Sequence, residues 1–96
     1  MTHFIITYDV SKDESREKLK RGIEKLGLRE QHSNQTTHFG TFSSFSLLNL
    51  ELLKIFGEIS FTQNDFVTVY KTTKNTNGAC DIEQVRVVIN GTIKAF

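Results

Sequence analysis

The chain has 96 residues, of which 38% are hydrophobic, and a formal net charge of +1. This length indicates one domain, residues 1–96, and the near-zero charge excludes a surface that is basic all over, so nucleic-acid binding would need a local patch. Cys80 is the only cysteine, which excludes an internal disulfide, and without a signal peptide or an apolar run of about 18 residues we expect a cytoplasmic protein that does not enter a membrane.

Residues 2–9 are expected to form a strand with two largely apolar faces. One face carries Phe4, Ile6 and Tyr8. The other carries Ile5 and Thr7 and ends on Asp9. Such a strand is typical of the centre of a sheet, so we expect helices on one face and a partner chain on the other.

Asp9 is the candidate catalytic and metal-binding residue. It stands at the carboxyl end of the first strand, and α/β proteins collect their ligands in the crevice outside such strand ends. The alternative is that Asp9 only ends the strand or helps to cap the helix that follows. The residue pattern leaves both interpretations open.

A helix is expected to begin near residues 11–13, where Ser11 and Glu14 have the spacing of a capping box. Its core-facing stripe at helical spacing is Leu19, Gly22, Ile23 and Leu26. Glycine costs about 1 kcal/mol relative to alanine inside a helix, so Gly22 on this stripe indicates close packing on the sheet. Gly27 is expected to end the helix.

The same helix carries the candidate nucleic-acid-binding cations. Lys18, Arg21 and Lys25 share one face, with Arg16, Lys20 and Arg29 close by. These side chains suit contacts to phosphates, which position a nucleic acid without reading its sequence. The alternative is a solvated face, because Glu14 with Lys18 and Glu17 with Arg21 have the i,i+4 spacing of stabilising ion pairs.

The rest of the chain predicts two β regions around a second helix. Residues 28–42 are polar and rich in threonine, which indicates one strand or a hairpin exposed on one face. Residues 44–56 predict a helix that is apolar nearly all round, hence buried on more than one side, and that Gly57 ends. Strands are expected over residues 66–70 and 84–89, with a turn or loop over 74–78, and the tail 92–96 is apolar enough to add to a neighbour.

The resulting order is β-α-β-(β)-α-β-β. It predicts an α+β fold of the ferredoxin-like kind, a split β-α-β sandwich with an extra strand at its C-terminal end. Because this fold serves many functions, it indicates none by itself.

Several motifs follow one another at regular positions: Tyr8-Asp9-Val10-Ser11, then Arg16, Lys18 and Leu19, then Gly27, then Arg29-Glu30-Gln31-His32-Ser33. In these the chain resembles the small second protein of the CRISPR adaptation system, a Cas-two type endonuclease family that shares a superfamily with virulence-associated protein D toxins. Residues 65–70 and 85–91 resemble later strands of the same family. One departure is Asn34-Gln35-Thr36, where the family usually has apolar residues.

The resemblance implies a homodimer in which Asp9 of each chain faces the other across a two-fold axis and binds a divalent metal, Mg²⁺ or Mn²⁺. It also implies an endonuclease of DNA or RNA that serves antiviral defence beside an integrase partner, with Tyr8 and Ser33 as orienting or phosphate-contacting groups. The alternatives are a toxin-like endoribonuclease with an antitoxin partner, a dimeric adaptor without catalysis, and an unrelated ferredoxin-like module.

The remaining candidate ligands show no recognisable arrangement. His3, His32 and His38 lie far apart without a ligand spacing, so we expect ordinary surface or half-buried histidines. Cys80 has no recognisable base partner, and we expect it to be structural or exposed.

Overall fold

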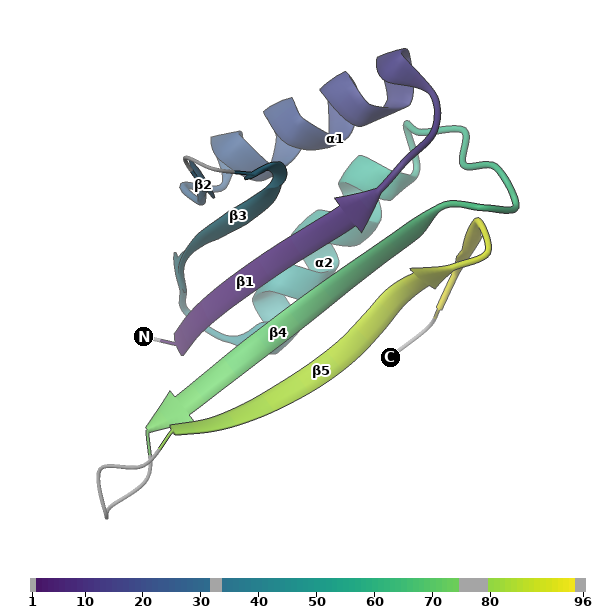
Figure 1. Ribbon diagram of the computed structural model, residues 1–96. Coiled ribbons are helices and arrows are strands. Elements are labelled where there is room, and N and C mark those ends of the chain that lie inside the picture. The colour runs from purple at the N-terminus through teal and green to yellow at the C-terminus, as the bar shows by residue number, and fades with distance from the viewer. Residues whose placement is uncertain (1, 32–33, 75–79, 95–96) are drawn as a thin grey trace.

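The structure is a computed structural model that describes residues 2–31, 34–74 and 80–94, with side chains over the same ranges apart from residues 34–35, 73–74 and 80. The elements follow in the order β1 (Thr2–Asp9), α1 (Asp13–Lys25), β2 (Arg29–Gln31), β3 (Asn34–Phe42), α2 (Phe45–Phe56), β4 (Phe66–Lys74), β5 (Cys80–Ile89) and β6 (Thr92–Ile93) (Figure 1). The α+β class is confirmed, and residues 28–42 form a hairpin rather than one strand.

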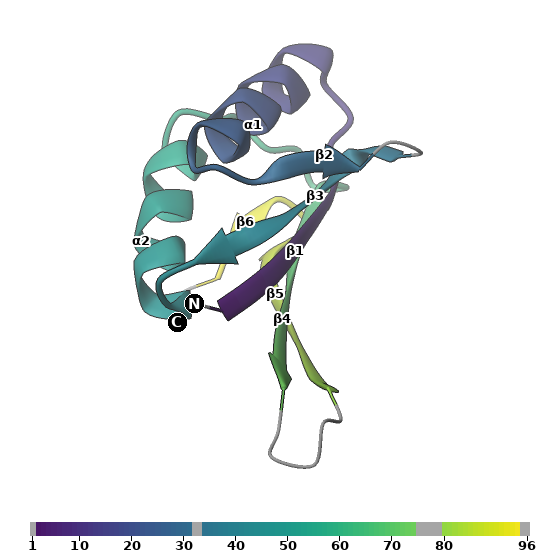
Figure 2. The ribbon, with the colours of Figure 1, turned by 90° about the vertical axis from the view of Figure 1, so that its left-hand side faces the viewer.

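The strands form one six-stranded antiparallel sheet in the order β2-β3-β1-β4-β5-β6. The prediction that β1 lies inside the sheet is confirmed, because β1 pairs with β3 on one side and β4 on the other. Helix α1 connects β1 to β2, and α2 connects β3 to β4. Both helices cover the same face of the sheet, and no element among the described residues covers the opposite face, which we call the bare face (Figure 1, Figure 2).

The core lies between the sheet and the two helices. The buried residues of β1 are Phe4, Ile6 and Tyr8, as the alternation predicts. They meet apolar side chains of α1, α2 and β4: Leu19, Ile23, Leu48, Leu52, Phe56, Val67 and Val69. Burying side chains of this kind is the main stabilising contribution in a domain of this size, about 1.5–3 kcal/mol for each fully buried one.

The start of α1 differs from the predicted capping box. The N-cap residue is Lys12, whose side chain makes no capping hydrogen bond. The Ser11 hydroxyl instead bonds Thr62 and Asp65, at 3.0 and 3.1 Å. These two residues, which are distant in the sequence, compete with Glu14 for the Ser11 hydroxyl. The predicted stop is confirmed, since Gly27 follows the helix with a φ of +95°, a conformation that favours glycine.

The close approach expected at Gly22 is present, but its partner is a helix and not the sheet. A Cβ on Gly22 would lie 2.9 Å from Cγ1 and Cγ2 of Ile55, on α2. The missing side chain of Gly22 therefore lets α1 and α2 approach each other above the sheet.

Helix α2 begins and ends as predicted. The Ser44 hydroxyl accepts a hydrogen bond from the Leu47 amide at 3.2 Å, and Gly57 is the C-cap. As predicted, the helix is buried on more than one side, against the sheet and, at Ile55, against α1, but Leu47 and Leu50 are 50% and 55% exposed, so it is not buried all round. Helix α2 lies in an outer layer, so only one of its faces meets the sheet (Figure 2).

The C-terminal strands are longer than expected. Strand β4 continues to Lys74 and β5 begins at Cys80, while residues 75–78 of the predicted loop lie outside the described part of the chain. The turn Asn90–Gly91, with φ values of 51° and 76°, folds β6 back on β5. The apolar tail thus pairs with its own chain over Thr92–Ile93. Neither helix in the described residues has the length and apolar character needed to cross a membrane.

Candidate functional site

Asp9 is the last residue of β1, on the bare face of the sheet. It stands opposite Phe66 of β4 in the register, and its side chain is exposed. In the described part of the chain its carboxylate has no hydrogen-bond or ion-pair partner, so it does not cap α1. One exposed carboxylate is too little to hold a metal alone, and further ligands would have to come from a second copy, from water or from a substrate.

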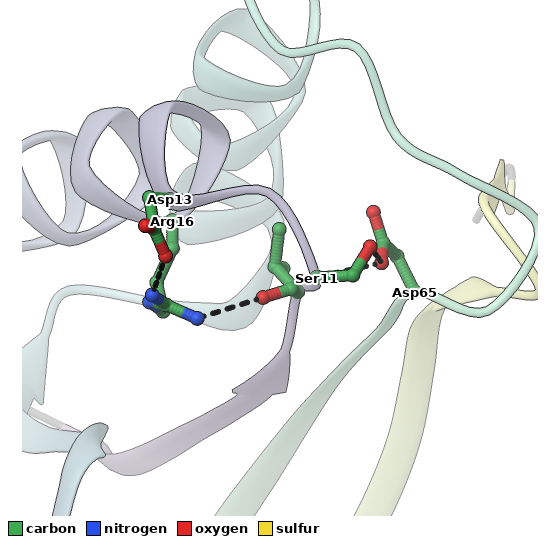
Figure 3. A network of polar contacts seen from close by, with 5 residues as sticks. Ser11, Asp13, Arg16 and Asp65 are labelled. Carbon is green, nitrogen blue, oxygen red and sulfur yellow. Dashed lines mark hydrogen bonds and ion pairs between the residues drawn. The ribbon is translucent and has the colours of Figure 1, made fainter.

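Arg16 stabilises the turn that follows Asp9. Its guanidinium donates to the Val10 carbonyl at 3.2 Å and forms an ion pair with Asp13 (Figure 3). Through these two contacts the Arg16 guanidinium stabilises the β1–α1 turn. A phosphate at this position would have to compete with both.

Lys18 and Arg21, two other predicted cations of α1, also have acidic partners, whereas Lys25 has no ion pair among the described residues. Lys18 lies 3.6 Å from Glu14, and Arg21 lies 3.9 Å from Glu17. These are the i,i+4 pairs that the sequence predicts, and the exposure of their side chains makes each worth only about 0.3–0.5 kcal/mol. The weak pairs leave Lys18 and Arg21 able to exchange partners.

Arg29 and Ser33 complete the predicted nucleic-acid-binding set. Arg29 is exposed on the bare face, beside Phe39 in the register, and has no ion-pair partner in the described residues. It therefore shares a face with Asp9, whereas Arg16, Lys18 and Arg21 belong to α1. Ser33 lies outside the described residues.

Asp65 stabilises the β1–α1 turn through its side chain. Its buried carboxylate accepts hydrogen bonds from the amide and hydroxyl of Ser11, at 3.0 and 3.1 Å (Figure 3). It also accepts hydrogen bonds from the amide and hydroxyl of Thr62, at 2.8 and 2.9 Å. Burial opposes its ionisation, but these hydrogen bonds outweigh burial and hold the pKa of Asp65 below 3.8. The network fixes the chain two residues after Asp9.

A second group of ionisable side chains lies between α1 and the β2–β3 hairpin. It comprises Glu24, Glu30 and His38, and one ligand atom of each lies within 4.8 Å of the others. His38 is fully buried, and its Nε2 lies 3.2 Å from Glu24 Oε2. We refer to these three residues as the Glu–Glu–His cluster.

Two neighbours surround the Glu–Glu–His cluster. Lys20 lies 3.2 Å from Glu30, and this hydrogen bond raises the pKa of Lys20. The ring of Tyr8 stacks on His38 with centroids 5.7 Å apart. Burial raises the pKa of Tyr8 to about 12, with further contributions from the negative charges of Glu24, Glu30 and Glu17.

Sequence reasoning missed this cluster. His38 was expected to be a surface or half-buried histidine, and it is wholly buried. Its inward position follows from the alternation of β3, in which it opposes the core residue Ile6. Its partners could not be found by spacing, because they come from α1 and β2. His3 is exposed as expected, while His32 and the Cys80 side chain lie outside the described residues.

No protein-family model matches this chain, and neither the curated proteins nor the solved structures include a significant match.

Proposed function

We propose that this protein is a ferredoxin-like homodimer that binds nucleic acid and hydrolyses its phosphodiester bonds with Mg²⁺ or Mn²⁺ between paired Asp9 carboxylates. The family resemblance of the N-terminal motifs is one support. The strand order β2-β3-β1-β4 is another, because two interleaved β-α-β units with both helices on one face produce it. Strands β5 and β6 extend this sheet at one edge.

The observation that carries the proposal is the position of Asp9. Its exposed carboxylate ends the strand that lies inside the sheet, and it points to the face that no helix covers. In an isologous dimer whose two-fold axis passes beside Asp9, the two copies of this carboxylate would face each other. Two carboxylates with water and a substrate phosphate are a typical Mg²⁺ environment, and the metal would activate water and offset charge on the phosphodiester.

The bare face also has features of an interface. Phe39 is 45% exposed on it. A hollow of about 300 Å³ lies beside Phe39 and is lined by His3, Ile5 and Thr72 among others. Exposed apolar groups around a hollow favour contact with another protein surface.

The second candidate function is a dimeric adaptor or interaction module without catalysis. The ion pairs of Arg16, Lys18, Lys20 and Arg21 favour it, because a phosphate gains less from a cation that already has an acidic partner. A toxin-like endoribonuclease of the virulence-associated protein D type would use the same Asp9. It differs from the first proposal in its partner, an antitoxin rather than an integrase.

Cleavage of single-stranded RNA and of double-stranded DNA with Mg²⁺ or Mn²⁺ tests the proposal. Asp9→Asn should lower cleavage by about a hundredfold or more, since it removes a metal ligand from each chain. The matched control is Asp81→Asn, which changes an exposed aspartate of β5. Equal cleavage by all three proteins would exclude Asp9, and a dimer that binds but cleaves nothing would establish the adaptor.

A further inference from the structure

The Glu–Glu–His cluster lies on the covered face of the sheet, away from Asp9. Glu24 comes from α1, Glu30 from β2 and His38 from β3. Glu30 and His38 stand opposite each other in the β2–β3 register, and Glu24 reaches them from the helix above. Three elements thus converge with one imidazole and two carboxylates.

The spacing of the ligand atoms suits one metal ion. Zinc binds histidine nitrogen and carboxylate oxygen at about 2.0–2.2 Å with tetrahedral angles, which places neighbouring ligand atoms about 3.4 Å apart. His38 Nε2 and Glu24 Oε2 are already 3.2 Å apart. The third ligand atom is within 4.8 Å, and the partly exposed Glu30 side chain can move closer.

Burial of His38 is an independent observation that points to a ligand. The ring is fully buried, directs Nε2 toward the carboxylates, and has no described hydrogen-bond partner for Nδ1. An ion on Nε2 would not pair Nδ1, so the observation that points to a ligand is the buried Nε2 that faces the carboxylates. A leucine or phenylalanine would fill the same space without an unpaired polar atom, so packing alone does not account for a histidine here.

The charge around the cluster is also unbalanced. Glu24 and Glu30 bring two negative charges close together, whereas the nearby Glu17 is paired with Arg21. Lys20 pairs with Glu30 and offsets one of them. Like charges at this separation repel, and a divalent cation would relieve the repulsion more fully than one ammonium group.

We propose that Glu24, Glu30 and His38 form a binding site for a divalent first-row transition metal ion. Imidazole with carboxylates suits zinc and its neighbours better than Mg²⁺ or Ca²⁺. The ion joins α1 to the β2–β3 hairpin and displaces Lys20 from Glu30. The Glu24 and Glu30 side chains are partly exposed, so water can reach the ion as a fourth ligand.

Calorimetric titration with Zn²⁺ tests this site, together with the visible spectrum of the Co²⁺ complex. All proteins carry Asp9→Asn, so that the site proposed on the other face does not contribute. We expect one Zn²⁺ per chain and a Co²⁺ spectrum typical of low coordination. Glu24→Gln and Glu30→Gln should each weaken binding by about tenfold or more, and both residues are partly exposed, so these variants should fold.

Two further variants test whether the ion binds at the Glu–Glu–His cluster. Glu14→Gln is the matched control, because Glu14 is also an acid with a lysine partner but lies outside the cluster; it should bind Zn²⁺ like the parent. Lys20→Met should bind about threefold to tenfold more tightly, because a competing cation is removed. Unchanged or weaker binding by Lys20→Met would contradict a metal at Glu30.

Other outcomes would also overturn the site. Absence of Zn²⁺ binding by the parent would do so. Binding that survives both Glu24→Gln and Glu30→Gln would assign the ion to exposed groups such as His3. Because the parent lacks the Asp9 carboxylate, failure here leaves the nuclease proposal standing, and failure of that proposal leaves this site standing.

Discussion

At the scale of single residues, Asp65 shows how a buried charge can serve the fold. Its carboxylate accepts bonds from the amides and hydroxyls of Ser11 and Thr62, and its carbonyl accepts one from the Gly91 amide at 2.9 Å. Asp65 therefore links the exit of β1, the loop before β4 and the β5–β6 turn. A neutral side chain of the same size would leave amides of this junction without a proper acceptor.

We expect Asp65→Asn to lower the free energy of unfolding by about 2–3 kcal/mol at pH 7, the range for hydrogen bonds to a charged group. The pKa of Asp65 in the folded protein lies below 3.8, its value in an unstructured chain. The stabilisation is therefore complete above about pH 5 and is lost as the pH falls through 3.8 toward the folded pKa. Urea unfolding of both proteins between pH 2.5 and 7 measures the difference.

Asp81→Asn is the control for this experiment, because Asp81 is exposed and its change should alter the free energy of unfolding by less than about 0.5 kcal/mol. A constant difference between wild type and Asp65→Asn down to pH 2.5 would show that the ionised carboxylate is not the source of the stabilisation.

At the scale of elements, the two helices are held together where Gly22 meets Ile55. An alanine at position 22 gains about 1 kcal/mol of helix propensity, but its Cβ would lie 2.9 Å from the Ile55 side chain, and overpacking costs about 1–3 kcal/mol. We expect Gly22→Ala to lower the free energy of unfolding by about 1 kcal/mol. Thermal and urea unfolding measure this loss.

Ile55→Ala provides the second side of a double-mutant cycle. In that background the obstructing atoms are gone, so Gly22→Ala should stabilise the protein rather than destabilise it. The same effect of Gly22→Ala in both backgrounds would mean that Ile55 does not set the distance between α1 and α2.

Features that depend only on residues close together in the chain could be predicted from the sequence. The alternation of β1 and the stops at Gly27 and Gly57 depend on neighbours in the chain, and the structure confirms them. The capping box failed because Ser11 bonds residues that are more than 50 positions away. The exposed leucines of α2 depend on its place in the layers, which an apolar pattern does not encode.

The candidate sites also divide into one that depends on local sequence and one that depends on contacts between distant elements. Asp9 could be located from one strand and the turn after it, because both its position and its face follow from the alternation. The Glu–Glu–His cluster could not, since three elements must fold together before Glu24, Glu30 and His38 meet. The pairing of Lys20 with Glu30 is non-local in the same way, whereas the pairs of Lys18 and Arg21 are local and were predicted.

At the scale of the whole molecule, the single chain is a two-layer structure with one sheet face uncovered (Figure 2). Phe39 and Ile82 are 45% and 67% exposed, and Phe39 stands beside Ile5 of β1 in the register. Five threonines share this face, Thr7, Thr37, Thr41, Thr68 and Thr72, and so do the charged residues Asp9, Arg29 and Arg86. A face of this composition suits contact with the same face of a second copy.

We expect the protein to sediment as a dimer and Phe39→Asp to sediment as a monomer, because the change removes an exposed apolar ring and places on the contact face a carboxylate that the dimer must desolvate, which weakens association by about a hundredfold or more. Leu47→Asp is the matched control: Leu47 is 50% exposed but lies on α2, on the other side of the molecule. It should leave the dimer intact.

The same variant separates dimerisation from the chemistry of Asp9. Phe39→Asp keeps both the Asp9 carboxylate and the strand that carries it, yet it removes the second carboxylate that a two-fold axis would supply. If paired Asp9 residues bind the metal, monomeric Phe39→Asp should lose cleavage to the same extent as Asp9→Asn, while Leu47→Asp retains it. A monomeric variant that still cleaves would mean that one Asp9 suffices, and the metal would then take its remaining ligands from water and the substrate phosphate.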